Sequence, residues 1–485
     1  MQRTAVLNVV GLTRGLIGPE TPRLATLLRT RHAAEIDPAF PAVTCTAQSN
    51  YLTGQPPAVH GIVANGWYNR ELAEVHFWKQ SNRLVTAPKI WDHLRARNPE
   101  FTCAQLFWWY NMYTTADWSI TPRPMYPADG RKFFDIYSWP QEIRPEIKRD
   151  LGEFPFAGFW GPAAGVKSPQ GGPDAATRWI GAAARWIEKK HQPTLSLIYL
   201  PHLDYNLQRY GTVAPGSAHR LPRVEIHPDL QQVDALVGDL VDFFEARGVQ
   251  VIVLSEYGIT TVDTPIHLNR LFRDRGWLTI KEELGLELLD AGNSRAFAVA
   301  DHQVAHVYVN DPGILSDVRT LLEATPGVAK VLDVSAQRDR SLFHSRSGDL
   351  LVVSEETAWF TYYYWREDTR APDFARCIDI HRKPGYDPVE LFLDPGIPWV
   401  KARIAVRLLQ KKLGFRMLMD VIPLNAALVK GSHGCRPANR SDWPLIISPR
   451  PLPGPCVEST AICRVIEEAI ESGPQVVLPS ETTLR

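Results

Sequence analysis

Small hydroxyl side chains crowd the stretch PAVTCTAQSNYLTGQPPAVHGIVANGWYN, residues 41–69. A stretch of this kind is most often only a turn. If Thr44 instead begins a helix, the backbone amides at that end attract an anion such as phosphate, and the Thr44 hydroxyl becomes a candidate nucleophile. A hydroxyl is a weak nucleophile alone, and coordination to a metal ion would activate it. The rest of the chain must therefore be searched for metal ligands.

Residue types that bind metal ions occur later in the chain, each at a predicted strand exit. Asp204 lies in YLPHLDYNLQRYG, Glu256 in VLSEYGI and His433 in KGSHGCRP. Carboxylate and imidazole groups are the ligands that Zn²⁺ and similar ions take in proteins. Taken singly, Asp204 is most often a helix N-cap, and a His-Gly pair is most often part of a loop. Only the combination of the three residues points to a site.

The elements that would position these residues follow a regular alternation. Short apolar runs predict buried, parallel strands at 5–10, 195–200 and 249–255. Amphipathic patterns between them predict helices at 21–30, 174–190 and 227–248. The alternation predicts an α/β fold with a central, mostly parallel sheet and helices on both faces. Ligands bind at the carboxyl ends of the strands in such folds, and Asp204 and Glu256 are expected there.

The pattern changes over residues 290–400, where short β-like runs and one helical segment predict an inserted α+β cap. We expect residues 1–289 and 401–450 to form the core, and residues 451–485 to form a C-terminal tail with a short helix. Two aromatic clusters, at 107–113 and 359–365, would fill cores or wall a pocket.

The amino-acid composition of the chain limits the kinds of molecule that we expect it to bind. Lys+Arg and Asp+Glu each number 53, so the net charge is zero and gives no electrostatic case for nucleic acid or an anionic membrane. The six cysteines have no paired spacing, and no apolar run approaches the ~20 residues of a membrane span. The N-terminal apolar run is interpreted as a first strand and not as a signal peptide. These features predict a reduced, cytoplasmic protein.

Taken together, the motifs resemble those of the alkaline phosphatase superfamily, in particular its branch of nucleotide pyrophosphatase/phosphodiesterases and phosphonoacetate hydrolase. In that branch a threonine nucleophile is followed by a Thr-Gly pair, a His-Gly pair and a phosphate-holding asparagine. Thr44 is followed at the same spacings by Thr53-Gly54, His60-Gly61 and Asn65. The later motifs of the family are similar to segments 199–211, 255–259 and 431–434, in the same order.

This resemblance implies a hydrolase with a two-metal site, usually zinc, at a sheet edge. It implies that Thr44 is the nucleophile, that a phospho-threonine forms, and that Asn65 holds the phosphate. The expected substrate is a phosphodiester, phosphomonoester or phosphonate of a small metabolite, with no nucleic-acid partner. Divalent metal is the expected cofactor, as one or two ions.

The sequence departs from the family at several implied metal ligands. Val10 stands where the family has its first aspartate, Tyr257 and Gln208 each stand where it has a histidine, and Glu256 replaces an aspartate. One half-site would keep Asp204, Gln208 and His433, and the other would keep Thr44 and Glu256. Because glutamine offers a harder oxygen ligand than imidazole, the first set favours Mg²⁺ or Mn²⁺ more than a full histidine set would.

Other residues are candidates to complete the second half-site. Asp379 and His381 are two apart in CIDIHRKPGYDP, so on a strand both would point to one face. Lys383 in the same segment is a candidate substrate-binding residue, because a cation there would hold phosphate. Further candidates are the single histidines His202, His267 and His302. The alternative hypothesis is a catalytically degenerate member of the family that binds a phosphorylated ligand or a partner.

Overall fold

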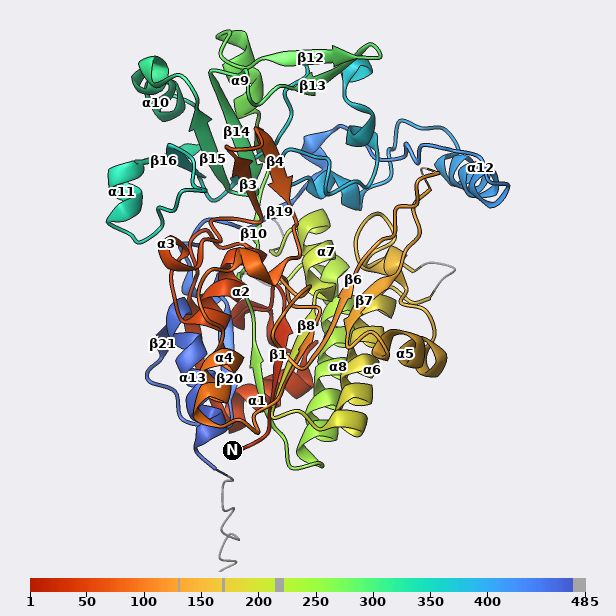
Figure 1. The fold of residues 1–485 in the computed structure, drawn as a ribbon, viewed down its shortest axis with the longest axis vertical. Helices are drawn as coiled ribbons and strands as arrows, with labels where there is room; N and C mark the ends of the chain where they lie inside the picture. The colour runs from red at the N-terminus through yellow and green to blue at the C-terminus, as the bar shows by residue number, and fades with distance from the viewer. Residues whose placement is uncertain (130, 168–170, 214–221, 474–485) are drawn as a thin grey trace, which may run out of the picture.

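The computed structural model describes residues 1–129, 131–167, 171–213 and 222–473. It has two units, stacked one above the other in Figure 1. The lower unit is built on a nine-stranded sheet with the order β21-β2-β20-β9-β1-β8-β5-β6-β7. Its strands are β1 (Thr4–Val9), β2 (His32–Asp37), β5 (Cys103–Leu106), β6 (Trp118–Pro122), β7 (Ile136–Trp139), β8 (Leu195–Leu200), β9 (Gln250–Leu254), β20 (Leu445–Ser448) and β21 (Cys456–Glu458).

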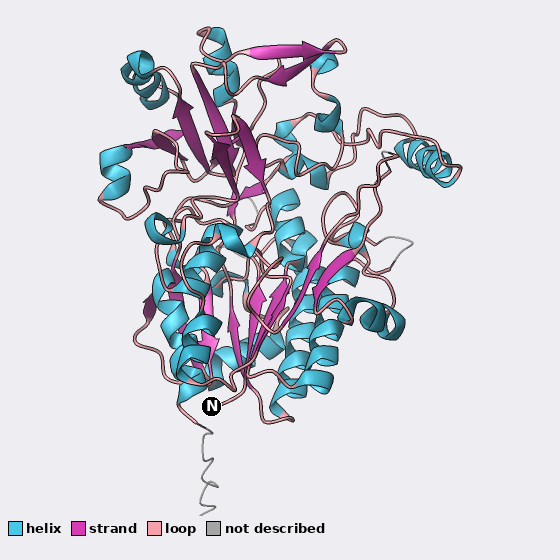
Figure 2. Cartoon of the chain, in the orientation of Figure 1, coloured by secondary structure: helices cyan, strands magenta, loops and turns pink. Residues whose placement is uncertain are grey.

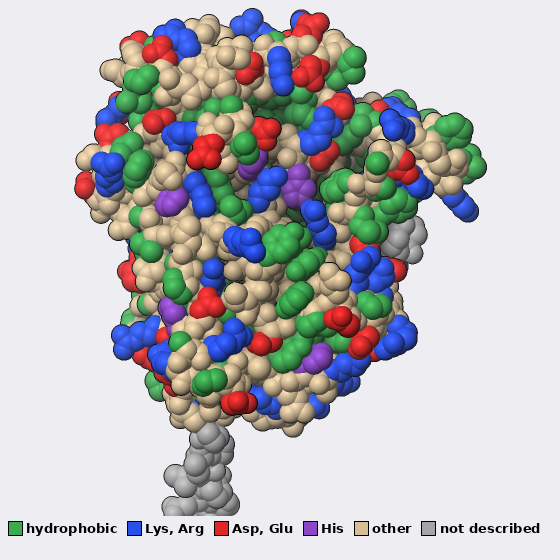
Figure 3. Space-filling view, in the orientation of Figure 1, with side chains coloured by type: hydrophobic (Ala, Val, Ile, Leu, Met, Phe, Trp, Pro, Cys, Tyr) green, Lys and Arg blue, Asp and Glu red, His purple; other side chains and the backbone are tan. Residues whose placement is uncertain are grey.

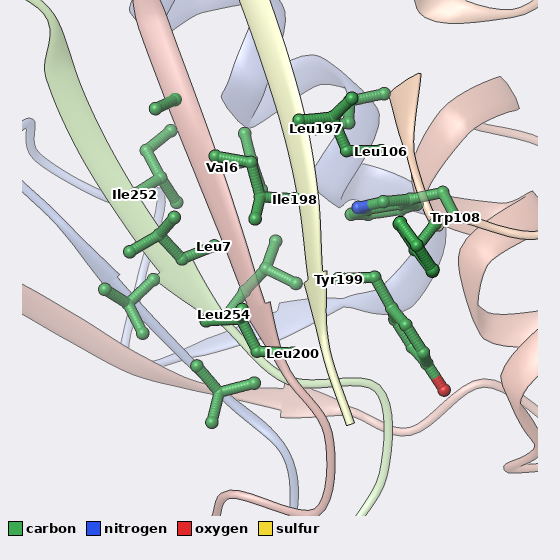
Figure 4. Close-up of a cluster of buried hydrophobic side chains, with 14 of the residues drawn as sticks. Val6, Leu7, Leu106, Trp108, Leu197, Ile198, Tyr199, Leu200, Ile252 and Leu254 are labelled. Carbon is green, nitrogen blue, oxygen red and sulfur yellow. The ribbon is translucent and has the colours of Figure 1, made fainter. Parts of the chain in front are cut away.

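The centre of this sheet is parallel, as the apolar runs predict. β1 lies between β8 and β9 and pairs in parallel with both, with Val6 opposite Leu197 on one side and Ile252 on the other. Every residue of β1 and β8 is buried, because helices cover both faces of the sheet. Figure 4 shows the aliphatic side chains of these strands packed against one another. The prediction of an α/β fold with a central, mostly parallel sheet is confirmed.

Two groups of helices cover the lower sheet (Figures 1 and 2). One group packs around α6 and α8, and the other around α2, α4 and α13. The helices of the unit are α1 (Pro22–Thr30), α2 (Thr44–Thr53), α3 (Pro57–His60), α4 (Ile90–Arg97), α5 (Ile143–Leu151), α6 (Ala175–His191), α7 (His202–Tyr210), α8 (His227–Glu245) and α13 (Ile462–Glu471).

The C-terminal segment differs from the expected tail. β21 extends the sheet by pairing in parallel with β2, and α13 packs against α2 and α4. Ile462, Ile466 and Ile470 lie on the buried face of α13, at the spacing of a helix with one apolar face. Residues 451–473 therefore belong to the lower unit, whereas 474–485 lie outside the described residues.

The upper unit has its own core around a four-stranded antiparallel sheet, β14-β15-β17-β16. It includes most of the expected cap, together with the β3–β4 hairpin and residues that precede position 290. Its elements are β3 (Gly66–Asn69), β4 (Glu74–Phe77), β11 (Thr264–Ile266), α9 (Leu268–Asp274), β12 (Ile280–Glu283), β13 (Leu286–Leu289), β14 (Ala296–Asp301), β15 (Val304–Val309), α10 (Leu315–Glu323), β16 (Val328–Asp333), α11 (Val334–Arg338), β17 (Leu350–Ser354), β18 (Ala358–Phe360) and α12 (Val400–Lys412).

A short ladder lies where the chain passes between the units. β10 (Thr260–Thr261) pairs antiparallel with β19 (Gly431–Ser432), so the segment after β9 meets the segment that carries His433. All six cysteines are free thiols. Among the helices that the structure describes, none is both long enough and apolar enough to cross a membrane.

Candidate active site

Thr44 is the first residue of α2, and it lies where the central strands of the lower sheet end. Asp204 follows β8 in the first turn of α7, and Glu256 and Tyr257 follow β9. The Thr44 hydroxyl is 3.4 Å from the hydroxyl of Tyr257, which donates a hydrogen bond to Asp204 Oδ1 at 3.1 Å. As expected from their places after the strands, these residues lie together at one edge of the sheet.

Asp204 forms hydrogen bonds with neutral side chains on both of its oxygens. Tyr257 donates to Oδ1, and Gln208 Nε2 donates to Oδ2 at 2.6 Å, one turn further along α7. The carbonyl oxygen of Gln208 in turn accepts from the hydroxyl of Tyr386 at 2.9 Å. Burial raises the pKa of the Asp204 carboxyl to about 7, although the bonds from Tyr257 and Gln208 oppose the shift.

Glu256 is also surrounded by neutral partners. Its Oε1 accepts hydrogen bonds from Asn8 Nδ2 on β1 and from Gln48 Nε2 on α2. Burial raises the pKa of Glu256 to about 8, against the opposing effect of the bonds from Gln48 and Asn8. Within the part of the chain that the structure describes, Glu256 Oε2 and Asn8 Oδ1 have no hydrogen-bond partner. Gln48 carries no sequence signal beyond its place on α2.

Four aromatic rings stack beside these carboxyls. The ring of His433 lies 3.6 Å from that of Tyr257 on one side and 3.6 Å from that of His302 on the other, and His302 stacks on Tyr386 at 3.5 Å. His433 Nδ1 donates to the backbone oxygen of Ala42, which fixes the orientation of the ring. Burial lowers the pKa values of both histidines, so both rings are neutral.

Asn65 connects the start of α2 to the upper unit. Its side-chain oxygen accepts from the backbone N–H of Cys45 at 3.0 Å, and its Nδ2 donates to Asp301 Oδ1 at 3.0 Å. Asp301 also accepts from His302 Nδ1 at 2.8 Å, and burial raises its pKa to about 6. Asp301 and Tyr386 were missed in the sequence, where the only signal was the Asp-His pair in ADHQ. We call these ten residues the Thr44 cluster: Thr44, Asn65, Asp204, Gln208, Glu256, Tyr257, Asp301, His302, Tyr386 and His433.

The candidates from segment 377–387 lie elsewhere. This segment contains no strand, so Asp379 and His381 do not share a strand face as expected. His381 Nδ1 donates to the backbone oxygen of Phe77. Lys383 is buried and forms ion pairs with Asp387 at 2.6 Å and Glu390 at 2.8 Å, which neutralise its charge inside the upper unit. With these contacts, Asp379 and His381 do not form the predicted second metal site, and the charge of Lys383 is not free to bind a phosphate.

The Thr44 cluster does not fit the pair of metal ions that the family resemblance implies. Val10 is buried and offers no ligand atom, and Tyr257 offers only a hydroxyl that is already bonded to Asp204. Both oxygens of Asp204 and the carbonyl oxygen of Gln208 accept hydrogens from protein groups. Across the described residues, no three His, Cys, Asp or Glu side chains are grouped so that they could hold a metal ion. At the positions where the family has its metal ligands, this protein has a hydrogen-bonded network of mostly neutral groups.

A sheet of this topology, with a threonine at a helix start beyond its strand ends, defines an α/β protein with an alkaline phosphatase-like fold. Known structures confirm this class. Phosphonoacetate hydrolase from Sinorhizobium meliloti, in complex with phosphonoformate, aligns over 97% of this chain and 96% of its own, with a TM-score of 0.58 and 15% identity. Murine ectonucleotide pyrophosphatase/phosphodiesterase 5 aligns over 98% and 96%, with a TM-score of 0.55 and 13% identity.

The family follows from the sequence match. The model of the type I phosphodiesterase/nucleotide pyrophosphatase family matches residues 4–387, and the chain belongs to this family of phosphoric-ester hydrolases. A curated relative, an uncharacterised pyrophosphatase/phosphodiesterase of Schizosaccharomyces pombe, is 23% identical over 264 residues, which are 52% of this chain. That match spans 44% of the relative, less than half of its length.

Proposed function

We propose that this protein hydrolyses a phosphoric ester of a small molecule, with Thr44 as the nucleophile. The observation that carries the proposal is the chain of contacts from the Thr44 hydroxyl to Tyr257 and from Tyr257 to Asp204. A nucleophilic hydroxyl needs a group that takes its proton. Here Tyr257 can take the proton of Thr44 and pass its own proton to Asp204. The inactive threonine-to-alanine variant of the murine relative, known in complex with AMP, supports the same role for Thr44.

The proposed reaction has two steps. In the first, Thr44 Oγ1 forms a bond to phosphorus while its proton moves to the Tyr257 oxygen and the Tyr257 proton moves to Asp204. The bond from phosphorus to the leaving alcohol breaks, and the alcohol takes a proton from water. In the second step, the hydroxide left from that water attacks the phosphorus, the bond to Thr44 breaks, and Thr44 regains its proton from Asp204 through Tyr257. Because the donor set does not fit a metal pair, no step is assigned to one.

A small organic phosphate suits the surroundings of Thr44. Trp78 lies 4.7 Å from Trp109 and 6.0 Å from Tyr386, ring centre to ring centre, and Trp160 lies 5.7 Å from Tyr386. Trp109 is also linked to α2, because its backbone N–H donates to Gln48. Aromatic faces of this kind bind flat organic groups by stacking. We therefore favour a substrate with a planar or compact organic group on the phosphate.

The test compares two threonines of the same helix. With a bis(nitrophenyl) phosphate diester as substrate, we expect Thr44→Ala to lose on the order of 10³-fold in kcat. Thr46 is also buried on α2, and among the described residues its hydroxyl bonds only to the backbone oxygen of Ile62, so Thr46→Ala should stay within a few-fold of wild type once folded. Turnover by Thr44→Ala at the rate of Thr46→Ala would remove Thr44 as the nucleophile.

A second candidate function is binding of a phosphorylated ligand without turnover. It is favoured by the hydrogen bonds that most polar groups of the cluster already make to one another, and by the 3% exposure of Thr44. Calorimetric titration with AMP and with inorganic phosphate separates the two functions. Binding of either probe by a protein that releases no nitrophenol would establish this second function. Turnover that depends on Thr44 would exclude it.

A further inference from the structure

Helix α12 exposes apolar side chains that a globular protein normally buries. Not one of its residues is buried, although it is thirteen residues long. Exposed fractions reach 55% for Val406, 55% for Leu409 and 65% for Leu413 just beyond its end. Trp399, immediately before the helix, is 86% exposed, and Phe415, after it, is 62% exposed. Isolated exposed apolar residues are common, but a contiguous group of them marks an interaction surface.

These side chains form one stripe, and the stripe faces away from the protein. Ala402, Val406, Leu409 and Leu413 are spaced by four, three and four residues, so they share one face of the helix. The side that faces the protein carries Val400 and Ile404, which pack against the core of the upper unit, and Arg403 and Arg407 at its edge both bond to Asp420. The helix α12 therefore has one apolar side on the protein and a second apolar stripe that faces solvent.

A second exposed apolar segment adjoins α12, from the loop formed by residues 125–129 and 131–134. Met125, Tyr126 and Phe134 are 44%, 52% and 50% exposed. Lys411 joins the loop to α12 by donating to the backbone oxygen of Lys132 at 2.9 Å, and its ammonium lies 5.4 Å from the ring centre of Phe134. Figure 1 shows this loop reaching α12 at one side of the molecule. We call α12 and this loop together the α12 surface.

The α12 surface is strongly basic, although the whole chain is neutral. Residues 399–418 hold six cationic side chains and no Asp or Glu: Lys401, Arg403, Arg407, Lys411, Lys412 and Arg416. Asp420 forms ion pairs with two of them, Arg403 and Arg407. Of the described carboxylates, none forms an ion pair with Lys401 or Lys412. Figure 3 shows cationic and apolar side chains together on the protrusion that Figure 1 labels α12.

We propose that the α12 surface binds a membrane surface that carries anionic lipids. An amphipathic helix with an apolar stripe, flanking lysines and an adjacent tryptophan lies in the plane of the headgroups, with the stripe in the acyl boundary. Anionic headgroups would balance the unpaired lysines. A second copy of this chain fits less well, because it would bring the same cations face to face. The excess of cations on the α12 surface favours anionic lipids at this place, even though the whole chain has zero net charge.

The experiment is co-sedimentation of the full chain with vesicles of phosphatidylcholine alone, or with about one third phosphatidylserine. We expect binding to the mixed vesicles that is at least tenfold tighter than to neutral ones and that weakens with salt. Removing both unpaired lysines, as Lys401→Gln with Lys412→Gln, should weaken it by on the order of 30-fold. Leu409→Glu with Leu413→Glu should abolish it.

The matched control is Leu284→Glu, which changes a fully exposed leucine in the β12–β13 turn, away from the α12 surface. That variant should bind like wild type, and all variants should keep the wild-type melting temperature because only exposed side chains change. Equal binding of the leucine pair variant and wild type would overturn the proposal. So would a failure of wild type to bind mixed vesicles at low salt, or a dimer in vesicle-free solution that the leucine pair variant dissociates.

Discussion

The Thr44 cluster and the α12 surface both depart from the usual placement of side chains, the first by burying polar groups and the second by exposing apolar ones. In the cluster, carboxyl, amide and imidazole groups lie in the interior, where each is costly unless it has partners, and most of them bond to one another. On α12, apolar side chains face solvent while arginines turn inward to Asp420. Each departure works against stability, and the two regions are therefore the strongest candidates for function in the molecule.

The difference between the regions lies in what completes them. The cluster is almost closed: its protein groups satisfy one another, and only a few atoms, such as Glu256 Oε2, lack a partner among the described residues. The α12 surface is open, because its stripe and its two unpaired lysines have no counterpart among the described parts of the chain. A closed network indicates internal chemistry, whereas an open face indicates an external partner.

The largest expected effect breaks the cluster at its central hydroxyl. Tyr257→Phe removes the group between Thr44 and Asp204 but leaves a ring to stack on His433. We expect kcat for a nitrophenyl diester to fall by on the order of 10²–10³-fold. The control is Tyr386→Phe, which stacks on His302 and bonds to Gln208 without touching Thr44. Equal losses in both variants would show that the two hydroxyls only support the hydrogen-bonded network and that Tyr257 does not relay a proton.

Shortening one aliphatic side chain on α13 and one on α12 compares a helix that packs against the protein with a helix whose apolar stripe faces solvent. Ile466 on α13 is fully buried, so Ile466→Ala should lower the free energy of unfolding by about 2–5 kcal/mol. Leu409 on α12 is 55% exposed, and Leu409→Ala should change that free energy by less than about 0.5 kcal/mol. Chemical denaturation of both variants measures the contrast. A large loss for Leu409→Ala would mean that the stripe is covered within the folded protein.

The buried, neutral His306 should make a contribution to the free energy of unfolding that is lost in acid. Burial lowers the pKa of His306 from 6.5 to about 4, and its ring donates to Val63 O while accepting from the N–H of Gly348. At this residue the unfolded chain therefore binds more protons between these values, and the contribution of His306 to stability falls as the pH drops from about 6.5 to about 4. From pH 7 to 4.5 this one residue should cost roughly 2.5 kcal/mol.

Denaturant midpoints at the two pH values, measured for wild type and His306→Gln, isolate that contribution. Glutamine does not titrate, so between pH 7 and 4.5 the variant should lose roughly 2.5 kcal/mol less stability than wild type, whatever its stability at pH 7. An unchanged slope would mean that His306 keeps its ordinary pKa in the folded protein. His60 and His267, whose pKa values burial lowers to about 3 and about 4, add to this loss in both proteins, whereas the raised pKa values of Asp204, Glu256 and Asp301 oppose it in both.

The smallest expected effect is that of metal removal. Because the cluster's ligand positions bond to protein groups, treatment with a chelator should change diester turnover by less than about twofold, and untagged protein should carry well under one ion per chain. Elemental analysis before and after chelation measures both. About two ions per chain, lost together with activity, would show that the neutral network opens to bind metal.

Much of this architecture is determined by local pattern in the sequence. The apolar runs of β1, β8 and β9 predict a buried parallel centre, because strands covered on both faces must be apolar throughout. The Pro at the start of α8 and the Gly after it predict a helix over nearly the observed bounds. The motif spacing from Thr44 to Asn65 identified the family, and the substitutions at Val10, Gln208 and Tyr257 already signalled an altered site.

The tertiary structure decided what those substitutions do. Tyr257 and Tyr386 are 129 residues apart in sequence, and only the fold brings one against each side of the histidine pair, with their hydroxyls on Asp204 and Gln208. The same holds for Lys383, whose basic character suggested phosphate until the fold paired it with two carboxylates. Sequence spacing specifies which side chains share a strand or a helix. Which of them become partners across elements depends on long-range packing, which no local pattern encodes.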